Sequence, residues 1–282
     1  MPMRHTIARE VAAEGITLHS GTQVRMMLAP ARPGTGVLFR RTDLDGAEVP
    51  ARYDTVAETN LGTMLAAGRA KVGVVEHLMA AVAGAEIDDL LVILDGPEPP
   101  ILDGDSLSYL ELLDKAGLKE QPAPRGAIKV LRRVEVTHKD GRAALAPADA
   151  AFFDMEIEFP SAAVGKQRYA FVFSPQGFRR EIAPARTFGF LTELEMLKEM
   201  DRGHGASLEN TLAIDGDKLI NPALMRFPDE FVRHKILDAI GDMALAGAPL
   251  IARFEGLRSG HALNNALLRA LFADDANYRR TP

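Results

Sequence analysis

Three residues with chemically active side chains recur at four-residue spacing in one segment of the chain. His234, Asp238 and Asp242 lie four positions apart, so in a helix they fall along one face. The other face is apolar, which predicts a packed helix, and buried charges are costly without a cation or another partner. Histidine nitrogen and aspartate oxygen suit Zn²⁺. The alternative is ordinary helix charges with a surface ion pair.

A catalytic zinc ion needs a third protein ligand and an open position for water. His77 is the natural candidate, because it lies in a corresponding helical segment of the first half of the chain. Glu76 beside it could act as general base on an activated water. The usual His-Glu-x-x-His motif and its inverse are absent, and a site with these ligands could also take Fe²⁺.

A further histidine, His261, follows Gly260 just before the last helical segment. A glycine beside a histidine at a helix start suits a positioned side chain. A cationic His261 could stabilise an oxyanion or protonate a leaving amine, with Asp242 holding it in orientation. The alternative is a loop before a helix with no special role.

The elements that must position these residues follow a repeated order. Each half runs strands, helix, strand, loop and helix, which favours an α+β protein of two similar domains over one irregular α/β domain. We expect domains at 1–122 and 127–282, each a β-sheet layered with two α-helices, with the active site in the cleft between them and a Pro-rich linker at 121–126. Apolar spacing predicts helices over 71–85, 106–116, 191–200, 229–246 and 262–272, and strands over 23–28, 36–41, 89–95, 128–137, 152–159, 167–173 and 249–255.

Composition excludes several classes of protein. Hydrophobic residues make up 47% of the 282, and there is no cysteine, so we expect a packed core without disulfides or thiol chemistry. The net charge of -6 gives no general attraction to nucleic acid. No signal peptide precedes the first strands, and no apolar run reaches the ~18 residues that span a bilayer. We expect a cytoplasmic monomer, for which transient contact with a membrane surface stays open.

Six segments together resemble one enzyme family over most of the chain, in the family's order. The resemblance is to UDP-3-O-acyl-N-acetylglucosamine deacetylases. It implies zinc-dependent hydrolysis of the N-acetyl group of UDP-3-O-[(R)-3-hydroxyacyl]-N-acetylglucosamine, which releases acetate in the committed step of lipid A biosynthesis. The matching segments are 15–21, 74–84, 95–104, 185–190, 231–242 and 259–265.

The resemblance also implies roles for individual residues. His77, His234 and Asp238 would bind zinc, Glu76 would be the general base, and His261 the cationic partner oriented by Asp242. Thr187 would help to hold the oxyanion, and an insert at about 188–215 would wall a passage for the acyl chain. The implied substrate contacts are Lys235, Phe188, Leu18, Leu61, Leu194 and Ser207.

Two departures from the family pattern affect only the substrate region. Ala146 stands where some members carry a lysine, and Ala206 stands where members often have glycine. Two other functions compete with the deacetylase. A zinc hydrolase for another acylated amino sugar would keep its activity without the UDP group, and a non-catalytic binding module would purify without metal.

Overall fold

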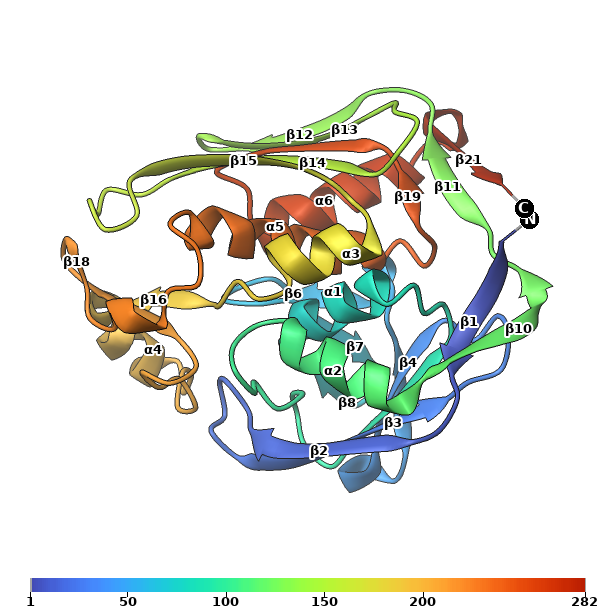
Figure 1. Ribbon diagram of the computed structural model, residues 1–282, viewed down its shortest axis with the longest axis horizontal. Coiled ribbons are helices and arrows are strands. Elements are labelled where there is room, and N and C mark those ends of the chain that lie inside the picture. The colour runs from blue at the N-terminus through green and yellow to red at the C-terminus, as the bar shows by residue number, and fades with distance from the viewer. Residues whose placement is uncertain (1, 282) are drawn as a thin grey trace.

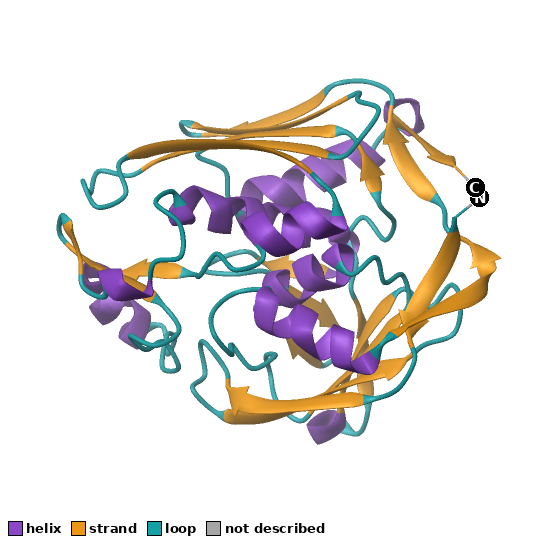
Figure 2. Ribbon diagram, in the orientation of Figure 1, coloured by secondary structure: helices purple, strands orange, loops and turns teal. Residues whose placement is uncertain are grey.

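Two five-stranded sheets form the outer layers of the protein in a computed structural model that describes residues 2–281 (Figure 1, Figure 2). The first sheet has the strand order β2-β3-β9-β4-β5. All neighbours in it are antiparallel except β4 and β9, which are parallel. Its strands are β2 (Val11–Ile16), β3 (Gln23–Pro30), β4 (Val37–Arg41), β5 (Ala47–Pro50) and β9 (Leu90–Leu94).

The second sheet repeats the topology of the first. Its order is β12-β13-β20-β14-β15, and its one parallel pair is β14 with β20. In each sheet, the strand that comes last in the chain, β9 or β20, lies between two hairpins. This shared topology confirms the two similar α+β halves expected from the sequence. The strands are β12 (Val134–His138), β13 (Gly141–Ala146), β14 (Phe152–Glu158), β15 (Lys166–Val172) and β20 (Arg253–Leu257).

Helices from both halves of the chain fill the space between the two sheets (Figure 2). The first half contributes α1 (Glu76–Gly84) and α2 (Leu107–Ala116), and the second half contributes α5 (Glu230–Ala244) and α6 (His261–Phe272). Helix α1 packs directly on α5 in the middle of the molecule. Both helices are buried over most of their surface, because α1 packs between α5 and α2, and α5 packs on α1, on α6 and on the second sheet. The faces of the two halves therefore meet at the α1–α5 pair.

Smaller sheets complete the fold. Strands β1 (Met3–Ile7) and β10 (Leu118–Pro124) pair with each other, and β11 (Ala127–Val130) lies between β19 (Leu250–Ile251) and β21 (Tyr278–Thr281). Each half also has one three-stranded insertion before its buried helix. The first holds β6 (Val56–Glu58), β7 (Met64–Ala67) and β8 (Ala70–Val72), and the second holds β16 (Phe188–Phe190), α4 (Leu194–Glu199), β17 (Leu212–Asp215) and β18 (Lys218–Leu219). A short helical stretch begins with α3 (Pro175–Gly177).

Several predicted boundaries differ from the structure. Helix α1 starts at Glu76 rather than at 71, because Ala70–Val72 pairs with β7 and Val74 has a φ of 51°, outside the helical region. The predicted linker at 121–126 is largely strand β10, which hydrogen-bonds to β1. The predicted strands over 128–137 and 249–255 are each divided between two sheets. Among residues 2–281, no helix has the length and apolar character to cross a membrane.

Candidate functional site

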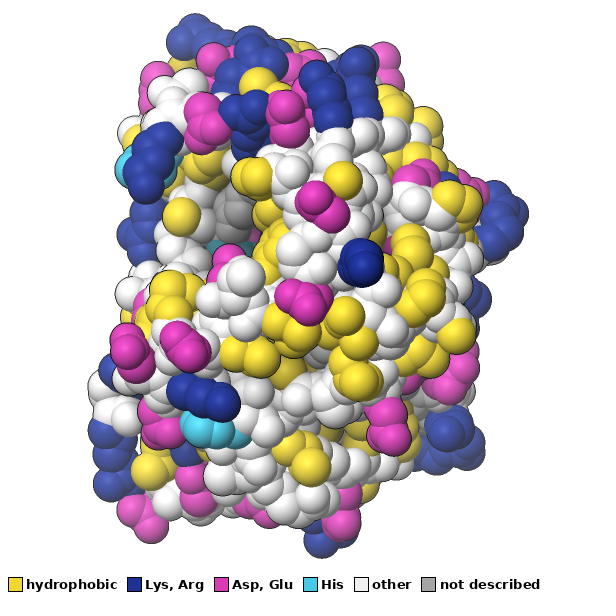
Figure 3. Space-filling model, turned by 90° about the vertical axis from the view of Figure 1, so that its left-hand side faces the viewer, with side chains coloured by type: hydrophobic (Ala, Val, Ile, Leu, Met, Phe, Trp, Pro, Cys, Tyr) yellow, Lys and Arg dark blue, Asp and Glu magenta, His cyan; other side chains and the backbone are white. Residues whose placement is uncertain are grey.

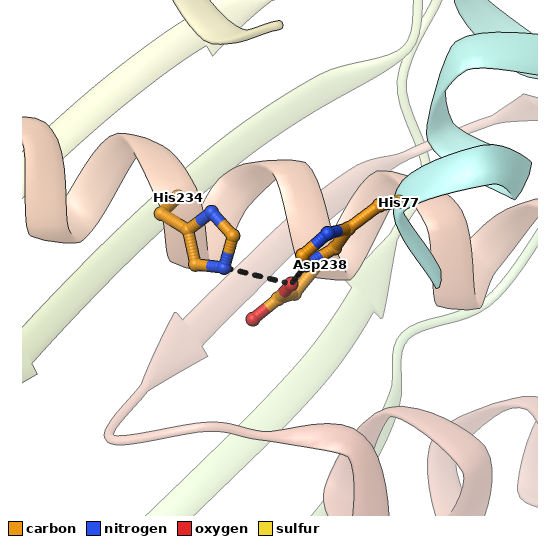
Figure 4. A group of neighbouring side chains, drawn as sticks. All are labelled: His77, His234 and Asp238. Atoms are coloured by element: carbon orange, nitrogen blue, oxygen red, sulfur yellow. Dashed lines mark ion pairs between the residues drawn. The ribbon is translucent and has the colours of Figure 1, made fainter. Parts of the chain in front are cut away.

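The three expected metal ligands converge where α1 and α5 meet. His234 and Asp238 lie one turn apart on α5, and His77 reaches them from the first turn of α1 (Figure 4). One ligand atom from each residue lies within 4.8 Å of the others. The Oδ1 atom of Asp238 is 3.6 Å from Nε2 of His77 and 3.4 Å from Nε2 of His234. All three side chains are buried.

The chemistry of these donor atoms fits a cation. Nδ1 of His234 donates to the carbonyl oxygen of Ala185 at 3.1 Å, and burial lowers the pKa of His234 to about 3. Nε2 of this neutral ring therefore presents a lone pair toward Asp238, whose Oδ1 has no hydrogen-bond donor among the described residues. Two buried electron-rich atoms that face each other are stabilised by a metal ion between them. The bond to Ala185 is the outer contact that metal-binding histidines usually make.

Lys235 contacts the second carboxylate oxygen of Asp238. Its Nζ donates to Oδ2 at 2.7 Å, and its side chain is 18% exposed. Burial alone would raise the pKa of Asp238, but the charge of Lys235 and the neighbouring histidines hold that pKa well below its usual range. Asp238 is therefore an anion whose Oδ2 is engaged and whose Oδ1 is free. The role of Lys235 in substrate binding stays a prediction, although its position at the edge of the site suits it.

Glu76 is the first residue of α1 and lies beside the three ligands. Its Oε2 accepts a hydrogen bond from the backbone N–H of Thr63 at 3.0 Å, and its Oε1 is 3.8 Å from Nε2 of His261. Burial raises the pKa of Glu76 above its ordinary value. A carboxylate with a raised pKa is better matched to proton transfer near neutral pH than an exposed one.

His261 is held by Asp242 at the start of α6. Nδ1 of His261 donates to Oδ2 of Asp242 at 2.9 Å. Burial by itself lowers the pKa of His261, but the charges of Asp242 and Glu76 outweigh burial and raise it to about 9. The Nε2 atom of a cationic imidazole thus points into the space shared with Glu76 and Asp238. The structure brings together six residues that the sequence singled out: His77, His234, Asp238, Glu76, His261 and Asp242.

Two further residues of this network were not predicted from the sequence. Thr63 donates through Oγ1 to Oδ1 of Asp242 at 2.6 Å, and Asn264 donates through Nδ2 to Oδ2 at 2.8 Å. Thr63 therefore connects Glu76 and Asp242 through hydrogen bonds. Asn264 lies one helical turn after His261, and this spacing could have suggested it. Thr63 precedes the insertion strand β7 and carries no comparable signal.

The predicted oxyanion residue Thr187 and the neighbouring Phe188 lie close to the ligands. Thr187 follows Ala185 by two positions, and its backbone N–H donates to the carbonyl of Gly104 at 2.9 Å. The ring of Phe188 is 6.2 Å from the ring of His234, edge to face. Phe188 is thus close to His234, one of the three candidate ligands, and Thr187 immediately precedes Phe188.

The remaining predicted substrate residues surround the site at a greater distance. The carbonyl of Leu18 accepts a hydrogen bond from the N–H of Gly205. The second insertion therefore lies against the turn between β2 and β3. The carbonyl of Leu61 accepts one from the ring of His19. Leu194 and Ser207 are exposed. None of these four belongs to the cluster of metal-binding side chains.

Apolar side chains gather on the outer face of the second insertion. Hydrophobic atoms cover part of this face beside a hollow (Figure 3). Six large apolar residues in it are at least 36% exposed, which is unusual for such side chains unless they meet a ligand or a partner. They are Leu191, Leu194, Met196, Met200, Leu208 and Ile220.

Comparison with known proteins matches nearly the whole chain to one enzyme family. The family model described as UDP-3-O-acyl N-acetylglycosamine deacetylase matches residues 4–273. A UDP-3-O-acyl-N-acetylglucosamine deacetylase of Phenylobacterium zucineum is 46% identical over 96% of this chain and 93% of its own length. The enzyme of the same name from Myxococcus xanthus is 43% identical over 99% of this chain and 89% of its own length. With this extent of matching, the chain belongs to the UDP-3-O-acyl N-acetylglycosamine deacetylase family.

Proposed function

We propose that this protein is a zinc-dependent amidohydrolase that removes the N-acetyl group of UDP-3-O-[(R)-3-hydroxyacyl]-N-acetylglucosamine and releases acetate, the committed step of lipid A biosynthesis. The observation that carries the proposal is the buried convergence of His77, His234 and Asp238 beside a carboxylate and a cationic imidazole. Relatives that match almost the full chain are named for this reaction, which supports the same substrate here.

The three ligands would hold Zn²⁺ through His77 Nε2, His234 Nε2 and Asp238 Oδ1. A zinc ion bound there supplies a water of lowered pKa, about 7 in characterised enzymes, and Lewis-acid stabilisation of negative charge. The two imidazoles and one carboxylate would leave a fourth coordination position open for water or substrate. The same ligands accept Fe²⁺, so the ion used in the cell is a separate question from the residues that bind it.

Glu76 acts as the general base in this proposal. Its carboxylate takes a proton from the attacking water, and the N–H of Thr63 keeps the carboxylate oriented. Burial, which raises the pKa of Glu76, increases its basicity toward that proton. The carboxyl group then holds the proton within 3.8 Å of His261, on the same side of the ligands.

His261 acts as the cationic partner. Asp242 fixes the ring through Nδ1, which leaves Nε2–H to stabilise the developing oxyanion and to donate a proton to the departing nitrogen. Thr187 would also contribute to stabilising the oxyanion. Amide hydrolysis needs this proton because an unprotonated amine is a poor leaving group.

The second insertion, about 188–215, forms the wall of an apolar passage for the 3-O-acyl chain. Phe188, Leu194, Leu18 and Leu61 would contact the acyl chain or the sugar, and Ser207 and Lys235 would contact polar parts of the substrate. The exposed apolar side chains of the insertion support this assignment. Ala146, where some relatives carry lysine, removes one polar contact without altering the ligands.

The domain boundaries and the setting of the enzyme are part of the same proposal. We place the N-terminal domain at 1–122 and the C-terminal domain at 127–282, with the catalytic cleft between them. The protein acts as a monomer in the cytoplasm, with brief contact to a membrane surface when it takes up its acylated substrate.

The deciding experiment combines metal analysis with an acetate-release assay on protein purified without oxygen. We expect one zinc or iron ion per chain and acetate release that stops on chelation and returns with Zn²⁺. The variant His77→Ala should lose the ion, whereas His138→Ala, altered at an exposed position of β12, should retain it. A protein that purifies without metal and releases no acetate on Zn²⁺ addition contradicts the proposal.

A further inference from the structure

A cavity lies between the two halves, at the end of α1 and α5 that is farther from the candidate metal ligands. Its volume is about 510 Å³, within the range of roughly 300–1,000 Å³ that small-molecule sites occupy. Met79, Val82 and Ala83 line it from α1, and Ile240 and Met243 line it from α5. None of its lining residues belongs to the site described above.

The walls of this cavity combine apolar and aromatic side chains with charged groups. The ring of Tyr53 stacks on Phe272 with 4.5 Å between centroids, and Tyr278 meets Phe272 edge to face at 5.0 Å. Phe153 and Leu250 contribute from the second half of the chain. A partly open cavity with apolar and charged lining groups suits a ligand that has both an alkyl or ring part and a charged head.

One cation at the rim has no carboxylate partner. Arg280 lines the cavity and lies 5.9 Å above the ring of Phe272, and it forms no ion pair within residues 2–281. The three other guanidinium groups of the lining are neutralised. The pairs are Arg4 with Asp89, Arg52 with Asp54, and Arg125 with Glu86 and Asp88.

We propose that this cavity is a ligand site for an amphipathic anion, whose alkyl part lies between α1 and α5 and whose carboxylate or phosphate head meets Arg280. An unpaired guanidinium beside an apolar cavity is complementary to a molecule of this form. Because the ligand would contact both halves, it would fix the position of α1 against α5 at the end away from the metal ligands.

Decanoate is a suitable probe, and methionine methyl groups report where it binds. Met79 and Met243 line the cavity, whereas Met196 and Met200 are exposed on the second insertion. Titration of metal-loaded protein with [¹³C-methyl]-methionine labels therefore separates binding in the cavity from binding in the proposed acyl passage. We expect saturable shifts of the Met79 and Met243 signals.

Two variants and a matched control test the two parts of the site. Ala83→Leu places a larger side chain in the cavity. This variant should abolish the decanoate-induced shift of the Met243 methyl signal. Arg280→Gln should weaken decanoate binding about two- to fivefold, the effect of one exposed charge contact. Arg279→Gln should leave binding unchanged, because successive side chains of β21 point to opposite faces and Arg279 does not line the cavity.

Three outcomes overturn the proposal. One is movement of Met196 and Met200 alone, with Met79 and Met243 unaffected at millimolar decanoate. Another is decanol binding as tightly as decanoate, which would remove the role of the anionic head. The third is equal weakening by the Arg279 and Arg280 variants. Because Arg280 is on the surface, its variant tests the site even if Ala83→Leu does not fold.

Discussion

Gly241 of α5 lies directly against the backbone of Glu76 in α1. A Cβ at position 241 would stand 2.0 Å from the carbonyl oxygen of Glu76, so only glycine allows this approach. The contact occurs one turn after Asp238 and immediately before Asp242. It brings the first turn of α1, with Glu76 and His77, within reach of the ligands on α5.

Replacement of Gly241 by alanine should therefore separate α1 from α5. We expect a loss of about 1–3 kcal/mol in the free energy of unfolding, the usual effect of overpacking, together with weaker metal binding because His77 moves. Urea denaturation and metal titration measure the two effects. Gly189→Ala is the control, since a Cβ there meets nothing within 4 Å. Equal metal affinity in the Gly241 variant and the wild type contradicts this role of the contact.

Removal of the proposed base should separate metal binding from turnover. Glu76→Gln keeps the shape of the side chain and leaves the donor atoms of His77, His234 and Asp238 unchanged. We expect metal content to stay near one ion per chain while acetate release falls by about 10²–10⁴-fold, as for loss of general base catalysis. Acetate release at the wild-type rate would rule out Glu76 as the base.

Asp242 should act through His261 rather than through the metal. Its charge is the largest of those that raise the pKa of His261, so Asp242→Asn should lower that pKa and leave less imidazolium at neutral pH. We expect acetate release to fall about tenfold or more, with metal content unchanged. Histidine ¹⁵N chemical shifts follow the protonation of the ring.

A surface control supports the interpretation of the Asp242 variant. Asp45→Asn removes an exposed carboxylate that pairs with Arg69 and should change neither the His261 signal nor the rate. If Asp242→Asn lost its metal in parallel with its activity, Asp242 would be needed to maintain the ligands instead of the imidazole.

Asp154 should contribute pH-dependent stability far from the site. Its hydrogen bonds from Arg168, and then from Arg253, hold the pKa of Asp154 below its ordinary value. A lowered pKa in the folded state gives stability that is present above the ordinary pKa of about 3.9 and is lost as pH falls through the folded-state pKa. Asp154→Asn should therefore unfold at lower urea near neutral pH, and the difference from wild type should shrink below about pH 4.

The exposed Asp149 provides a control for the urea unfolding of Asp154→Asn at different pH values. It pairs with Lys129 at the surface, and such pairs contribute little to stability. Asp149→Asn should match the wild type at each pH. A constant difference between Asp154→Asn and the wild type from about pH 7 to about pH 3 would show that the ion pairs of Asp154 do not carry the effect.

The sequence by itself determined the parts of the site that depend on local geometry. His234, Asp238 and Asp242 fall on one helix face because a helix repeats every 3.6 residues, and the structure keeps that relation. The repeated order of elements likewise predicted two similar halves, since each buried helix and strand carries its own apolar pattern. The family resemblance supplied the residue roles, which no local pattern contains.

Only the tertiary structure decided which distant side chains meet. Thr63 reaches both Glu76 and Asp242, and no periodicity relates positions 63, 76 and 242. The start of α1 also depended on long-range contacts, because pairing of β7 with β8 extends the chain where apolar spacing favoured a helix. Local preferences are worth fractions of a kcal/mol per residue. Sheet pairing and close helix packing outweigh them, and these contacts bring Glu76, His261 and the three candidate ligands together.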